Sequence, residues 1–222
     1  MKKIKTIELF AGTQSFSKVV KKSGHKTFAT DYEEIDGQDL VADIHDLRAK
    51  DFPYLHPDIL WASPPCEGFS VASIGANWKG GYRAYKPKTD TARRSIDLVK
   101  QALRIIDEVQ PKYFFIENPQ GVLKKLDLLK HVPFMHTIWY CQYGDTRAKP
   151  TNIWTNAPWF KPRPVCHNYK YDKAGKIIKK HCHHESARRG AKTGTQGVDG
   201  YKNRSRIPGE LFKEILKQYA NK

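Results

Sequence analysis

The sequence contains no long hydrophobic run and few cysteines. No apolar stretch among the 222 residues approaches the roughly 20 residues that a membrane-spanning helix needs. The apolar part of the N-terminal segment MKKIKTIELF is too short for a secretory signal peptide. We therefore expect a cytoplasmic protein, whose four cysteines serve as a reactive thiol or metal ligands rather than disulfides.

Acidic residues are also few. The chain has 23 Asp and Glu against 39 Lys and Arg, a formal net charge of +16. This excess predicts a polyanionic partner, because each Lys or Arg that contacts a phosphate releases a condensed counterion. A soluble basic protein without such a partner is the alternative. The charge is concentrated in residues 161–206, where eight Lys and five Arg face two Asp and one Glu, a net charge of +10.

Apolar residues, at 39% of the chain, suffice for a packed core. Short apolar runs at 5–10, 25–30, 58–62 and 113–116 predict strands, and the amphipathic segments 15–23 and 91–109 predict helices. Strands that alternate with helices form a parallel sheet covered on both faces. Such sheets bind ligands at the carboxyl ends of their strands. Gly12, Asp31, Cys66 and Glu117 follow four of these strands, so we expect an active site at that edge.

The pattern changes after about residue 158, where Pro, Lys, His and Gly dominate. A last helix is expected near the C-terminus, with Ser205 as its cap and Pro208 in its first turn. Its apolar face would pack on the main domain. We therefore expect three parts: a main domain (1–158), a small basic region (159–204) and a C-terminal helix (205–222).

Three segments carry a family resemblance. They are ELFAGTQSFS at 8–17, PCEGFS at 65–70 and FIENP at 115–119, in this order. Together they resemble the DNA (cytosine-5) methyltransferase family, in its small phage or bacterial type, over residues 4–158. The resemblance implies an α/β, Rossmann-like fold that uses S-adenosyl-L-methionine, with a small basic target-recognition insert. It also implies double-stranded DNA as the partner, with the target cytosine flipped out of the helix; we expect a monomer.

The resemblance gives Cys66 the role of nucleophile, adding to carbon 6 of cytosine so that carbon 5 can attack the methyl group. That role calls for a lowered thiol pKa. Glu117 would hold the base at N3 and its exocyclic amine. Arg147 and Lys149 would contact the base or its flanking phosphates. The alternatives are a buried structural cysteine for Cys66, a loop or helix-start carboxylate for Glu117, and a solvated basic loop for Arg147 and Lys149. Pro119 stands where the family usually has Val.

The resemblance also implies the cofactor site: Phe10, Ala11, Gly12, Asp31, Tyr32, Asp43, Ile44 and Pro65. Asp31 would accept from the ribose hydroxyls beside Tyr32, and Asp43 from the adenine amine; ordinary turn acids are the alternative. The sequence departs from the family in two places. Gln14-Ser15 replaces a glycine pair, and residues 205–208 read Ser-Arg-Ile-Pro instead of Asn-x-Val-Pro.

Contacts with DNA and with a metal are expected at the following residues. The residues expected to contact DNA are Ser70, Arg83, Lys86, Arg93, Arg94, Arg163, Arg188 and Arg189. Those from Arg83 to Arg94 lie in the stretch 75–94, which follows the nucleophile as the family's mobile loop does. Cys166, Cys182 and His184 are candidate ligands of a structural zinc ion, although their spacing matches no standard finger and unligated surface residues are equally consistent with it.

Three other functions remain open at the level of the sequence. The chain could methylate RNA or tRNA, or an amino group of a DNA base, since Ser63-Pro64-Pro65 fits the start of the amino-methyltransferase motif. It could also bind DNA without catalysis. A role in restriction-modification, in phage self-protection or as an orphan regulator would give the same sequence pattern.

Overall fold

The fold comes from a computed structural model, which describes residues 3–35, 37–81, 84–166, 169–180 and 200–222. Its strands are β1 (Lys5–Leu9), β2 (Lys26–Asp31), β3 (Leu40–Val41), β4 (Ile59–Ala62), β5 (Trp78–Lys79), β6 (Lys86–Pro87), β7 (Tyr113–Pro119), β8 (Phe134–Trp139), β9 (Pro150–Thr155), β10 (Tyr169–Tyr171) and β11 (Ile177–Lys180). Its α-helices are α1 (Ser15–Lys22), α2 (Ile74–Asn77), α3 (Asp90–Val109), α4 (Tyr201–Ser205) and α5 (Gly209–Ala220). Short 3-10 turns are η1 (Ala49–Asp51), η2 (Val71–Ser73), η3 (Leu123–Lys125), η4 (Asp127–Leu129) and η5 (Tyr140–Tyr143).

A seven-stranded sheet forms the centre of the described part of the chain, in the order β3-β2-β1-β4-β7-β9-β8. The first five strands pair in parallel, and β9 runs antiparallel to both β7 and β8. The sheet is therefore mostly parallel, which confirms the expected α/β, Rossmann-like class. β8 and β9 were not predicted, because their apolar residues show neither a clear alternation nor a continuous run.

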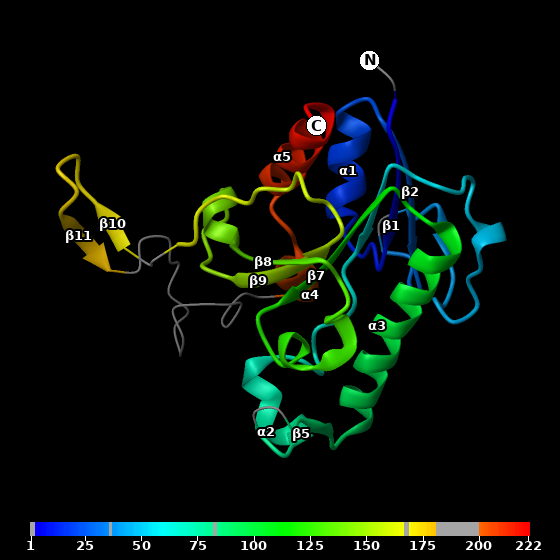
Figure 1. The fold of residues 1–222 in the computed structure, drawn as a ribbon, viewed down its shortest axis with the longest axis horizontal. Coiled ribbons are helices and arrows are strands. Elements are labelled where there is room, and N and C mark those ends of the chain that lie inside the picture. The colour runs from blue at the N-terminus through cyan, green and yellow to red at the C-terminus, as the bar shows by residue number, and fades with distance from the viewer. Residues whose placement is uncertain (1–2, 36, 82–83, 167–168, 181–199) are drawn as a thin grey trace.

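Helices cover the two faces of the sheet (Figure 1). Successive side chains of a strand point to opposite faces, and in β4 Leu60 and Ala62 join the core under α3 while Ile59 and Trp61 join the core under α1 and α5. A strand buried on both faces favours apolar residues at every position, which explains the continuous hydrophobic run at 59–62.

The predicted helices need small corrections at their ends. α3 begins one residue earlier than expected, with Thr89 as its cap; the Thr89 side chain accepts a hydrogen bond from the Ala92 N–H at 3.3 Å. The predicted cap of the last helix was wrong. Ser205 ends the short helix α4, and α5 begins at Gly209 after Pro208 in an extended conformation. Proline fixes φ near the value that a helix entry requires, so Pro208 rather than Ser205 marks the start.

The C-terminal part of the chain contributes a hairpin and a packed helix. β10 and β11 form an antiparallel hairpin within the predicted target-recognition region, drawn apart from the main sheet in Figure 1. Leu211, Phe212, Ile215 and Leu216 of α5 are buried in the core that includes α1. Within the described ranges, no helix is both long and apolar enough to span a membrane.

A candidate active site at the carboxyl edge of the sheet

The parallel pairing brings the predicted site residues to one edge. Leu9 pairs with Thr30 and with Ala62, and Ala62 pairs with Ile116, so four strands end side by side. Each strand carries one of the polar groups predicted above at or just after its carboxyl end: Asp31 ends β2, Glu117 lies near the end of β7, and Gly12 and Cys66 follow β1 and β4. The local sequence thus places these residues at strand ends, and the register of the sheet brings them together.

The turn that carries Cys66 is anchored from three sides. The Asn118 Nδ2 amide donates to the carbonyl of Pro64 at 3.0 Å, from the neighbouring strand β7. The indole N–H of Trp78 donates to the carbonyl of Gly68 at 2.6 Å, and the Gly68 N–H donates to the Ser95 hydroxyl of α3 at 3.2 Å. A Cβ on Gly68 would collide with the Ser95 side chain, so this close approach requires glycine.

Cys66 is half-buried and lies close enough to Glu117 and Lys149 for both to act on its thiol. Burial is the largest effect and raises the pKa of Cys66; the positive charge of Lys149 acts in the opposite direction, and Glu117 raises the pKa further. The lowered thiol pKa expected for a nucleophile is therefore not found here. Lys149 is the group in the site that favours the thiolate.

Glu117 is a buried carboxyl group with donors on several sides. The hydroxyl of Tyr140 donates to Oε1 of Glu117 at 2.8 Å. Burial raises the pKa of Glu117, while Lys149, the Tyr140 hydrogen bond and a Ser63 hydrogen bond lower it. Because burial dominates, this carboxyl retains its proton to a higher pH than an exposed glutamate does. A side chain that acts as a general acid needs this property.

Arg147 and Lys149 were predicted together but are placed differently. Lys149 is 8% exposed, and its ammonium lies 4.9 Å from the centre of the Tyr140 ring, beside Cys66 and Glu117. The Arg147 guanidinium pairs with Asp145 through Nε at 2.9 Å and Nη2 at 2.5 Å, and Nη1 donates to the Asn203 carbonyl at 2.9 Å. The structure therefore brings Lys149, and not Arg147, to the thiol.

Replacement of Lys149 by methionine is expected to slow the methyl transfer that the motifs predict about 10- to 100-fold at neutral pH, because removing its charge raises the pKa of Cys66 further and depletes the thiolate. The loss should diminish as pH rises, so the alkaline shift of the kcat/KM profile is the diagnostic measurement. Lys124→Met, which removes an exposed cation elsewhere, should leave the profile unchanged. A uniform loss at every pH would contradict this role for Lys149.

The predicted cofactor loop follows β1. The Gly12 N–H donates to Oδ2 of Asp31 at 2.8 Å, which ties the loop to the end of β2. Phe10, Gly12 and Gln14 have φ values of 55°, 46° and 52°, in the left-handed region. Gln14 thus adopts the conformation that the family's glycine would favour, at a cost of about 1 kcal/mol.

The other predicted cofactor residues lie along the same edge. Asp31 is 8% exposed, and burial raises the pKa of its carboxyl. Tyr32, the residue after Asp31, is 54% exposed. Asp43 and Ile44 lie in the loop between β3 and η1, and Ile44 is buried. Ala11 is buried and Pro65 is half-buried.

Glu8, which the sequence analysis missed, supports the cofactor loop from beneath. This buried carboxylate of β1 accepts hydrogen bonds from the N–H groups of Phe16 at 3.1 Å and Ser17 at 2.8 Å, in the first turn of α1. Burial raises the pKa of Glu8 to about 7. Its signal in the sequence is one carboxylate inside an apolar strand, a position that requires hydrogen-bond partners.

Glu8 should make the free energy of unfolding depend on pH. The folded protein holds the proton on the Glu8 carboxyl more tightly than the unfolded chain does. The contribution of Glu8 to the free energy of unfolding should therefore fall by about 3 kcal/mol as pH rises from about 4.5 to about 7. Denaturant unfolding of the wild type and of Glu8→Gln at pH 5 and 7.5 would measure it. The decrease should be smaller in Glu8→Gln; equal decreases in the two proteins would contradict the assignment.

The predicted DNA-binding residues are placed as follows. Lys86 is exposed on β6, and Arg93 and Arg94 are exposed in the first turns of α3, the helix whose Ser95 hydroxyl accepts from the Gly68 N–H of the Cys66 turn. Arg93 pairs with Asp90 at 3.2 Å, and Ser70 forms a bridge with Gly121. Nε of Arg163 contacts Oε2 of Glu214 at 2.6 Å, and its Nη1 donates to the Gln142 carbonyl at 2.6 Å. Arg83, Arg188 and Arg189 lie outside the described residues.

The zinc prediction is not supported by the described residues. Cys166 is buried beside Cys141 and Ala148, whereas Cys182 and His184 lie outside the described ranges. Within those ranges, no group of three or more His, Cys, Asp or Glu side chains could hold a metal ion.

Comparison with known proteins places the chain in a family. Residues 3–135 match the model of the C-5 cytosine-specific DNA methylase family. A protein of Frog virus 3 (isolate Goorha), named "Probable DNA (cytosine-5)-methyltransferase", is 30% identical over 165 residues, which cover 72% of this chain and 74% of the viral one. A Methanocaldococcus jannaschii protein named as a candidate type II methyltransferase is 31% identical over 85 residues, 38% of this chain and 22% of that protein.

Among solved structures, the S. pombe Dnmt2 methyltransferase aligns with 16% identity and a TM-score of 0.47 over 72% of this chain; the chain spans 52% of that structure's length. The family match confirms the resemblance carried by the three motifs, and with it the enzyme class and the DNA cytosine-5 methyltransferase function. The chain belongs to the C-5 cytosine-specific DNA methylase family.

Proposed function

We propose that this enzyme transfers a methyl group from S-adenosyl-L-methionine to carbon 5 of a cytosine flipped out of double-stranded DNA, through a covalent adduct with Cys66. The observation that carries the proposal is the grouping of Cys66, Glu117 and Lys149 at the carboxyl edge of the sheet. A thiol beside a buried carboxyl group and a buried ammonium group is the set that addition to a pyrimidine ring needs.

The residues expected to hold the cofactor suit its chemistry. The carboxylates of Asp31 and Asp43 accept hydrogen bonds, as ribose hydroxyls and an adenine amine require, and Tyr32 places an aromatic side chain directly after Asp31. Gly12 lets the methionine portion approach the backbone closely. S-adenosyl-L-methionine, when bound, supplies the electrophilic methyl group.

The chain's own residues carry the remaining steps. The Cys66 thiolate, favoured by Lys149, forms a bond to carbon 6, and the electron pair of the 5,6 double bond moves onto carbon 5. Glu117 donates its proton to N3 and stabilises the charge that builds on the ring. After carbon 5 has taken the methyl group, a water molecule accepts the carbon 5 proton. The 5,6 double bond then re-forms as the bond between carbon 6 and sulfur breaks, which releases the Cys66 thiolate, and the N3 proton returns to Glu117.

Access to the base requires that the enzyme extrude it from the duplex, because carbon 6 is enclosed by stacked neighbours. Lys86, Arg93 and Arg94 are exposed beside the Cys66 turn, which suits contacts to phosphates that flank the target. We assign target recognition to 159–204, the most basic part of the chain, with 1–158 as the catalytic domain and 205–222 as its closing helix. One flipped base per catalytic domain is compatible with a monomer. A structural zinc ion stays a prediction.

Nucleoside mass spectrometry tests this function. Unmodified duplex DNA, incubated with the purified protein and S-adenosyl-L-methionine, is expected to yield 5-methylcytosine. A product methylated at an amino nitrogen would instead identify the reaction as amino-group methylation. Product on tRNA but not on DNA would move the substrate to RNA, and binding of DNA without any product would leave a binding protein.

A further inference from the structure

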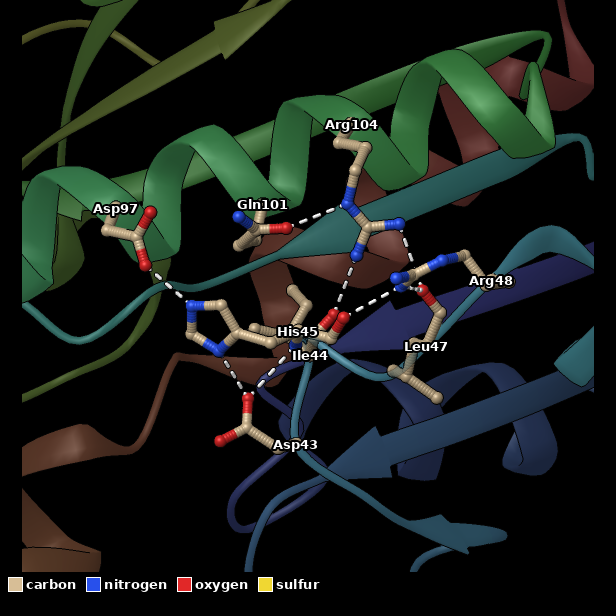
Figure 2. Close-up of polar contacts among 8 residues, drawn as sticks. All are labelled: Asp43, Ile44, His45, Leu47, Arg48, Asp97, Gln101 and Arg104. Atoms are coloured by element: carbon tan, nitrogen blue, oxygen red, sulfur yellow. Dashed lines mark hydrogen bonds and ion pairs between the residues drawn. The ribbon is translucent and has the colours of Figure 1, made fainter.

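The loop of residues 43–47, which carries two of the expected cofactor contacts, is held by side chains of α3 (Figure 2). Nη2 of Arg104 donates to the carbonyl of Ile44 at 2.8 Å, and Nη1 donates to the carbonyl of Leu47 at 2.9 Å. The same guanidinium contacts Gln101 at 2.7 Å and Glu108 at 2.6 Å on its own helix. Arg104 is therefore fixed by its helix while it binds two carbonyls of the loop.

A histidine forms the second connection between this loop and α3. Nδ1 of His45 lies 2.5 Å from Oδ1 of Asp43, and Nε2 lies 2.5 Å from Oδ2 of Asp97. The His45 backbone N–H also donates to Oδ1 of Asp43, at 2.9 Å. Both contacts use the same oxygen, so they fix the carboxylate and direct its other oxygen, Oδ2, away from His45. The Asp43 side chain is 51% exposed and accessible to a ligand.

We propose that Arg104 and His45 are positioning residues for the adenosine half of the cofactor site. They fix the loop before the cofactor arrives, so that binding does not have to order it. The inference rests on the proposed placement of the cofactor at Asp43 and Ile44. Among the described contacts, Arg104 and His45 bond to the loop and to α3 rather than to Cys66 or Glu117, so they should act on cofactor affinity rather than on the chemical step.

The histidine connection should respond to pH. Both ring nitrogens of His45 face carboxylates, and both can donate only when the imidazole is protonated. The charged groups around it are Asp43 on the loop, Arg48 directly after the loop, and Asp97 and Arg94 on α3. The two carboxylates raise the pKa of His45. As pH rises through that pKa one connection is lost, and cofactor affinity should weaken.

The test compares KM for S-adenosyl-L-methionine with kcat, and calorimetric binding of S-adenosylhomocysteine, in Arg104→Met, Arg104→Lys and His45→Gln. Arg104→Met should raise KM about 10-fold with kcat within about twofold of the wild type. Arg104→Lys should raise KM nearly as much, because an ammonium group cannot bind both loop carbonyls and both side chains of α3 at once. Lys100→Met, an exposed cation on the same helix, is the matched control.

The outcomes separate this inference from the function it rests on. If Asp43→Ala leaves S-adenosylhomocysteine binding unchanged, the proposed cofactor placement is wrong. If Asp43→Ala weakens binding but Arg104→Met and His45→Gln do not, only the positioning role is wrong. If Arg104→Met does not fold, the exposed His45 decides alone: His45→Gln should abolish the weakening of cofactor affinity at high pH, and an unchanged pH profile would overturn the proposal.

Discussion

Replacement of Cys66 by serine is expected to lower the rate of methyl transfer at least about 10³-fold, because a hydroxyl is a far weaker nucleophile than a thiolate near neutral pH. Serine has nearly the shape of cysteine, and the Pro64 and Gly68 contacts of the turn involve only backbone groups of those residues. The fold and DNA affinity should therefore be retained. Initial rates on duplex DNA, together with fluorescence anisotropy for binding, measure the two properties separately.

The control for this variant is Cys141→Ala, which removes a buried thiol from a different cluster and should leave methyl transfer intact. Duplex DNA with 5-fluorocytosine at the target gives a second readout. Because fluorine cannot leave carbon 5 as a proton does, the wild type should form a complex that survives denaturation, and Cys66→Ser should not. Residual activity above about a tenth of the wild-type rate would exclude Cys66 as the nucleophile.

Replacement of Glu117 by glutamine should lower kcat about 10²- to 10³-fold with little change in DNA affinity, because an amide cannot give a proton to N3 of cytosine. The amide oxygen can still accept the Tyr140 hydrogen bond, so the side chain should keep its place. Single-turnover rates, which isolate the chemical step from product release, are the appropriate measurement.

The pH profile of the wild type provides an independent test of this pair. The Cys66 thiol must lose its proton and the Glu117 carboxyl must keep one, so kcat/KM should rise and then fall with pH. Glu117→Gln should lose the alkaline fall. Tyr140→Phe is the milder companion: it removes a hydrogen bond that lowers the pKa of Glu117, so its alkaline limb should move to higher pH. A rate for Glu117→Gln within threefold of the wild type would contradict proton donation by this residue.

The sequence by itself determined the local elements and the family. The runs at 59–62 and 114–116 are apolar throughout because strands covered on both faces must be, and this pattern is visible without a structure. The turn residues that follow them identify the carboxyl edge of the sheet, where Cys66 and Glu117 are found. The order of the three motifs was sufficient for the family that residues 3–135 match.

Only the tertiary structure decided which side chains meet. Lys149 lies beside the thiol while Arg147, two residues earlier, pairs with Asp145, and Arg163 contacts Glu214 of α5. Lys149, whose charge acts on Cys66, and the Tyr140 hydroxyl that reaches Glu117 both come from segments far away in the chain. Contacts between residues so far apart in sequence depend on strand register and helix packing, which short-range patterns of polarity do not encode.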